Sequence, residues 1–77
     1  MTPNQLARAQ VRALTDRQRD VLRMIANSVT QEVIASCLGV TRHTVGYHRG
    51  KLQRILGLAP NDTAGLTRVA MRANLIK

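Results

Sequence analysis

The chain has 77 residues, which is enough for one small domain with a core near the lower limit for independent stability. Its single cysteine, Cys37, excludes an internal disulfide framework, so the core must come from side-chain packing. The sequence contains neither an apolar run long enough to span a membrane nor a secretory signal pattern. These bounds favour a cytoplasmic protein over a secreted or membrane-spanning one.

The positive charge is concentrated in one part of the chain. Twelve Lys and Arg against four Asp and Glu give a formal net charge of +8, yet residues 33–61 contain no acid at all. A solvated basic face is one interpretation. Attraction to nucleic acid is the favoured one, because the acid-free span coincides with one predicted helix. With one Tyr and no Phe or Trp, the chain lacks aromatic platforms for stacking single-stranded bases, which favours duplex DNA.

The first thirteen residues form a segment of their own. Thr2 can cap a short helix with Pro3 at its first position, and Arg8 and Arg12 would then share one face. A mobile basic arm is the alternative, because the segment is poor in large apolar side chains. We therefore divide the chain into an N-terminal basic arm or short helix, residues 1–13, and a main domain, residues 14–77.

Thr15 opens the first strongly indicated helix. The run Thr15-Asp16-Arg17-Gln18 matches a capping box, in which the side chains of the first and last residues each bond the other's backbone N–H. Asn27-Ser28 marks the end of this helix. Apolar side chains recur at helical spacing at Val21, Leu22, Ile25 and Ala26, with Val29 just beyond.

Two further helices are predicted on either side of Gly39. Thr30 can cap a short helix that runs to about Leu38, and Thr41 can cap a longer basic helix over residues 42–56. Gly39 is able to take a positive φ angle and make the tight turn between them. The apolar positions of the first helix are Val33, Ile34, Cys37 and Leu38, and Cys37 is expected to be a small buried side chain. In the second helix the residues expected to face inward are Val45, Leu52, Ile55 and Leu56.

A last helix is predicted from Asp62 or Thr63 to about Asn74. Its apolar positions are Leu66, Val69, Ala70 and Ala73. Runs of alternating β-branched residues are lacking throughout the sequence, so the expected fold is all-α with four to five short helices.

A short helix, a turn containing Gly and a longer basic helix describe a helix-turn-helix, whose second helix enters the major groove of DNA. Across nearly the whole chain from Leu14, the sequence resembles the LuxR-type (GerE-like) DNA-binding domain. The residues that carry the resemblance are Leu14-Thr15, Arg17, Arg19-Asp20-Val21-Leu22, Ile25-Ala26, Ile34-Ala35, Leu38-Gly39-Val40, Thr44-Val45, His48 and Leu56-Gly57-Leu58.

The resemblance implies a tetrahelical helix-turn-helix domain that binds double-stranded DNA at specific sequences, as a homodimer, and regulates transcription. The predicted DNA-binding residues are Thr30, Thr41, Arg42, His43, Thr44, Gly46, Tyr47, His48, Arg49, Gly50, Lys51 and Arg54. The predicted dimer interface consists of Leu66, Val69, Ala70 and Ala73. Catalytic constellations and metal-ligand spacings are lacking, so we expect neither an enzyme nor a cofactor or metal. Such a regulator would associate with the nucleoid.

Two glycines on one face of the predicted recognition helix depart from the family pattern. Gly46, Tyr47 and Gly50 occupy positions that the resemblance assigns to base edges, but two of the three have no side chain. The helix either approaches DNA closely through this bare face, or has given up base reading and keeps phosphate contacts, or docks another protein through it.

A second interpretation assigns the chain to another class of protein. The alternative is an anti-activator that pairs with a related regulator, or with the transcription machinery such as RNA polymerase, and blocks or modifies DNA binding. The sequence also leaves open a C-terminal fragment of a longer regulator, although Met1 and the N-terminal helix favour a complete, free-standing protein.

Overall fold

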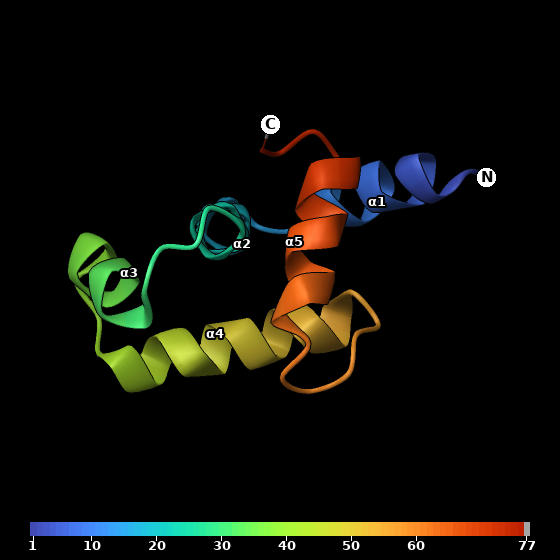
Figure 1. The fold of residues 1–77 in the computed structure, drawn as a ribbon. Coiled ribbons are helices and arrows are strands. Elements are labelled where there is room, and N and C mark those ends of the chain that lie inside the picture. The colour runs from blue at the N-terminus through green and yellow to red at the C-terminus, as the bar shows by residue number, and fades with distance from the viewer. Residues whose placement is uncertain (77) are drawn as a thin grey trace.

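The computed structural model describes residues 1–76, which form five α-helices and contain no strand (Figure 1). The predicted all-α fold is confirmed. None of the helices in this range is long and apolar enough to cross a membrane. The helices are α1 (Pro3–Arg12), α2 (Asp16–Ala26), α3 (Gln31–Leu38), α4 (Arg42–Ile55) and α5 (Thr63–Arg72).

Every helix begins directly after a side chain that caps it. At α2 the predicted capping box is present: Gln18 N–H donates to Thr15 Oγ1 at 3.1 Å, and Thr15 N–H donates to Gln18 Oε1 at 2.9 Å. Each cap of this kind typically contributes about 1 kcal/mol. Local sequence therefore sets where the helices start. The five capping residues are Thr2, Thr15, Thr30, Thr41 and Asp62.

The N-terminal segment is a helix that packs against the C-terminal one. Ala7 and Val11 of α1 are buried, and α1 lies against α5 (Figure 1). Val11 belongs to the same hydrophobic cluster as Leu14, so α1 contributes to the core of the whole domain. The division of the chain at residue 13 stays a prediction.

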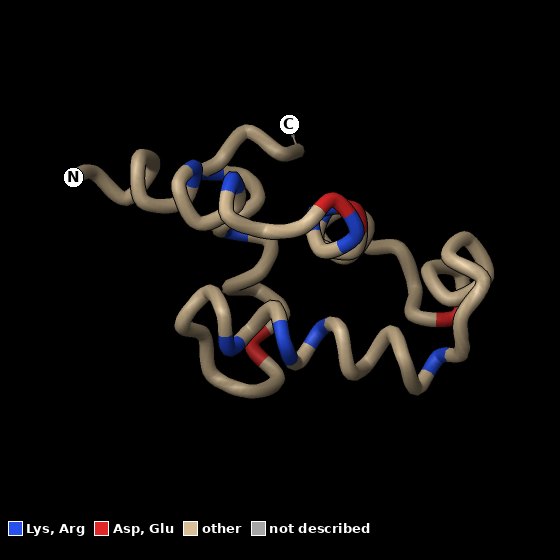
Figure 2. Tube along the Cα trace, turned by 180° about the vertical axis from the view of Figure 1, so that it is seen from behind, with Lys and Arg blue, Asp and Glu red and all other residues tan. Residues whose placement is uncertain are grey.

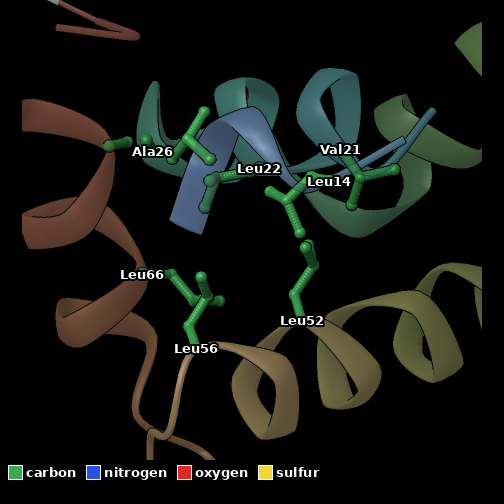
Figure 3. Close-up of a cluster of buried hydrophobic side chains, with 9 residues drawn as sticks. Leu14, Val21, Leu22, Ala26, Leu52, Leu56 and Leu66 are labelled. Carbon is green, nitrogen blue, oxygen red and sulfur yellow. The ribbon is translucent and has the colours of Figure 1, made fainter. Parts of the chain in front are cut away.

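The main core lies where α2, α4 and α5 meet. Figure 3 shows side chains from these helices converging, with α4 below α2. A second, smaller cluster of Ile34, Ala35 and Val45 joins α3 to α4. Because α4 contributes to both clusters, its position relative to the rest of the domain is fixed at both ends. The residues labelled in Figure 3 are Leu14, Val21, Leu22, Ala26, Leu52, Leu56 and Leu66.

Three residues at predicted apolar positions are exposed. Ile55 is 45% exposed, because Leu52 and Leu56 already occupy the inward face and Ile55 lies about a quarter-turn away from Leu56. Cys37 and Val33 are also exposed, since α3 packs against α4 through the other side of its surface. The prediction of a buried Cys37 was therefore wrong.

Candidate nucleic-acid interface

The turn between α3 and α4 places α4 along one side of the molecule. Gly39 adopts a φ of +69°, the left-handed conformation that glycine takes without strain, and Val40 N–H donates to Ala35 O at 3.0 Å. Figure 1 shows α4 running along that side, with α3 near its beginning and α5 near its end. The arrangement is the predicted helix-turn-helix.

The outward face of α4 is defined here by the exposed residues His43, Tyr47, Lys51 and Arg54. The opposite side of the helix is anchored in the core, so these side chains point away from it. Figure 2 shows Lys and Arg at intervals along the α4 trace, which carries no acidic position itself, whereas the acids lie on α2, on α3 and before α5. The outward face therefore presents positive charge and hydrogen-bond donors.

The residues around the starts of α3 and α4 are mostly exposed, with Thr44 half-buried, and one of them is ion-paired. Thr30 and Thr41 cap α3 and α4, and Thr41 Oγ1 lies 3.0 Å from Thr44 Oγ1. Arg42 Nη1 lies 2.8 Å from Glu32 Oε1, with both side chains about two-thirds exposed. An exposed pair of this kind adds little stability. Arg42 is therefore free to exchange the carboxylate for a phosphate.

Gln31, at the start of α3, connects the two helices of the motif. Its Nε2 donates to the backbone carbonyl of Arg42 at 3.2 Å, and Arg49 Nη1 donates to its Oε1 at 3.5 Å. Arg49 is half-buried and lines an inner hollow together with Val45 and Ile25. The structure therefore places Arg49 on the side of α4 that faces its neighbours, away from the outward face.

The two glycines of α4 have different surroundings. A Cβ atom at Gly46 would lie 3.0 Å from Gln31 Nε2, whereas a Cβ at Gly50 would meet no described atom within 4 Å. Gly46 therefore leaves room for the Gln31 amide, and only Gly50 faces open space. Sequence reasoning treated the two as one bare face and missed the role of Gln31.

A shallow hollow of about 280 Å³ opens on the flank of α4 that carries Gly50. Gln53 lines it, is only 3% exposed, and has an Nε2 without a hydrogen-bond partner within residues 1–76. The sequence offered no sign of this site, because it depends on the loop after α4 folding back beside the helix. The hollow is lined by Gly46, Tyr47, Gly50, Gln53, Arg54, Leu58 and Pro60.

The predicted dimer residues on α5 divide into two pairs. Leu66 and Ala70 are 0% exposed and pack in the chain's own core, so they have no surface to offer a partner. Val69 and Ala73 are half-buried at the edge of that core. The predicted dimer surface is therefore reduced to Val69 and Ala73.

A basic helix on the surface, fixed by a tight turn to a shorter helix and anchored in a small helical core, defines a helix-turn-helix DNA-binding domain. The chain belongs to the luxR family of bacterial regulatory proteins, whose GerE family model matches residues 12–69. The matched range contains α2, α3 and α4, whereas nearly all of α1 precedes it. The resemblance seen in the sequence is confirmed, and the chain carries the DNA-binding domain of this regulator family.

A transcriptional regulator with a similar sequence supports the same class of protein. The chain is 38% identical over 63 residues to the transcriptional regulatory protein MctR of Rhizobium johnstonii. The alignment covers 82% of this chain and 28% of MctR, so the chain spans less than a third of that protein's length. No solved structure matches the chain significantly.

Proposed function

We propose that this protein regulates transcription by binding specific double-stranded DNA sequences, with the outward face of α4 in the major groove. The supporting observation is that this face is exposed, basic and free of acid on a luxR-family helix-turn-helix. A helix of this kind fits the major groove, which is about 12 Å wide. The side chains that read the base edges are those of His43, Tyr47, Lys51 and Arg54.

Contacts to the phosphates come from the beginnings of α3 and α4. Thr30, Thr41 and Thr44 lie where helix N-termini attract anions, and Arg42 supplies a guanidinium close by. Such contacts fix the position of the protein on the duplex without reading its sequence. His48, half-buried beside Tyr47 with ring centroids 5.8 Å apart, borders the same surface. Arg49 contributes indirectly, through Gln31.

The proposed assembly is a homodimer that binds a two-fold symmetric site. Helix-turn-helix dimers contact half-sites about one helical turn apart, so the symmetry of the protein is matched in the DNA. In this chain Val69 and Ala73 of α5 are the remaining predicted contacts. Sedimentation of Ala73→Arg and of the native chain tests the assignment, because a large charged side chain at the contact converts dimer to monomer.

The test of DNA binding is selection of duplexes from a randomised pool, followed by affinity measurement against the selected and a scrambled sequence. We expect an enriched motif that is bound at least about a hundredfold more tightly than the scrambled duplex. Equal affinity for the two duplexes would overturn sequence-specific binding. It would favour the alternative, an interaction protein that pairs with a related regulator or with the transcription machinery.

A further inference from the structure

The hollow beside Gly50 combines an apolar surface with an unused hydrogen-bond donor. Leu58 and Pro60 line the hollow on the loop side. The space above Gly50 is empty, because a Cβ there would meet no described atom within 4 Å. Gln53, which also lines the hollow, is buried, and its Nε2 donates no hydrogen bond to any of residues 1–76. A buried amide donor without a partner is costly, so it indicates a missing acceptor.

The charge around the hollow indicates what kind of partner brings that acceptor. Arg54 lines the hollow, Lys51 is exposed on the adjoining outward face, and none of the residues that line the hollow is acidic. The acid nearest in sequence, Asp62, caps α5 by accepting from Gly65 N–H. A polyanion is attracted to such a surface, whereas a second copy of this chain, with its net charge of +8, is repelled from it. The hollow therefore suits duplex DNA.

Among the base edges in the major groove, thymine alone has an apolar group. It presents the C5-methyl group next to the O4 acceptor, whereas cytosine presents an amino donor and no methyl. We propose that the hollow beside Gly50 is a subsite for a thymine edge, with the methyl over Gly50 and against Leu58, and O4 accepting from Gln53 Nε2 after the side chain turns outward. This inference rests on the proposed function of α4 as the helix that reads DNA.

Replacing thymine by uracil tests the methyl contact, because uracil keeps the base pair and O4 but lacks the methyl. Each thymine of a duplex selected by the full chain is replaced in turn, and affinity is measured by fluorescence anisotropy. We expect one thymine per half-site at which uracil weakens binding about fourfold, the effect of losing one buried methyl group. In Gly50→Ala the same replacement has no effect, because the added methyl occupies the place over the helix that the thymine methyl would take.

Two further variants separate the parts of the subsite. Lys51→Ala is the matched control, because Lys51 lies next to Gly50 but does not line the hollow. It should weaken binding to the thymine and the uracil duplex equally and keep the fourfold ratio between them. Gln53→Leu removes the donor to O4, so affinity falls for thymine and uracil alike and the fourfold ratio between them is kept. Melting curves verify that each variant is folded.

The results can overturn the thymine subsite without overturning sequence-specific DNA binding. If no thymine shows a difference from uracil, or if the difference persists in Gly50→Ala, the subsite is overturned while sequence-specific binding stands. If selection yields no preferred duplex at all, the proposed function fails and the inference fails with it.

Discussion

At the scale of single residues, three glycines that look alike in the sequence have different surroundings in the fold. Each lies inside a helix, where glycine costs about 1 kcal/mol against alanine. A Cβ at Gly50 faces open space, at Gly46 it presses on Gln31 Nε2 at 3.0 Å, and at Gly65 it meets Asp62 Oδ2 at 2.5 Å and Leu58 at 2.9 Å. The helix propensity is equal at the three sites, so the neighbours decide the effect of substitution.

The first prediction compares Gly50→Ala with Gly65→Ala. Gly50→Ala should raise the melting temperature by about 4 °C, because it gains helix propensity without a clash. Gly65→Ala should lower it, since the cap that Asp62 Oδ1 makes with Gly65 N–H at 2.8 Å must shift and the buried site is overfilled. Thermal melts followed by circular dichroism measure both. A rise in both variants would contradict the packing around Gly65.

The second prediction concerns Gln31 and Gly46. In the native background Gly46→Ala should raise the melting temperature less than Gly50→Ala does, or lower it, because the added methyl displaces the Gln31 amide from the Arg42 carbonyl. In a Gln31→Ala background that obstacle is gone, and Gly46→Ala should stabilise the chain as Gly50→Ala does.

The measurement is a double-mutant cycle of melting temperatures, with Gly50→Ala made in both backgrounds as the control. The control pair should be additive, since Gly50 lies away from Gln31 and faces open space. Additivity of Gly46→Ala and Gln31→Ala as well would show that Gly46 does not make room for Gln31.

At the scale of elements, α1 was the helix whose role remained open in the sequence. Its capping residue and proline predicted a helix, but its few large apolar side chains were equally consistent with a basic arm. The structure buries Ala7 and Val11 against α5, so small and medium side chains suffice where two helices pack closely. By contrast, α2, α3 and α4 were predicted with bounds within about a residue, because caps and apolar spacing are local signals.

The third prediction separates packing from charge in α1. Val11→Ala should destabilise the chain by about 2 kcal/mol, because it removes two buried methyl groups from the core. The control is Arg8→Ala, an exposed position on the same helix, which should leave the melting temperature unchanged. A mobile basic arm would give the reverse pattern: Val11→Ala would leave the stability unchanged, and Arg8→Ala would reduce the affinity for DNA.

At the scale of the whole molecule, charge determines how strongly DNA is attracted. The net charge of +8 resides mainly in arginine, and the outward face of α4 concentrates part of it where a duplex would lie. Binding to DNA releases the counterions condensed on each phosphate that the protein neutralises. This contribution does not depend on the base sequence.

The fourth prediction is that DNA affinity falls steeply with salt. Between about 50 and 200 mM salt we expect a loss of at least tenfold for selected and scrambled duplexes alike. Arg42→Ala should reduce the slope of log affinity against log salt by about one per protomer, whereas Ser36→Ala, an exposed uncharged change on α3, should leave it unchanged. A slope that does not respond to Arg42 would place the phosphate contacts elsewhere on the molecule.

The sequence by itself determined the helices, their caps and the family. Threonine caps, helical apolar spacing and the turn at Gly39 act over a few residues, so they can be read without the fold. The acid-free basic span likewise identified α4 as the candidate DNA-binding helix.

Only the tertiary structure decided which side chains of those helices are available. It turned Arg49 towards Gln31, buried Leu66 and Ala70 inside the chain and left Ile55 exposed. It also brought Leu58 and Pro60 back beside Gly50 to form a hollow. Each outcome depends on contacts between segments distant in sequence, which helical periodicity does not encode because it ranks the positions around one helix and leaves their neighbours unspecified.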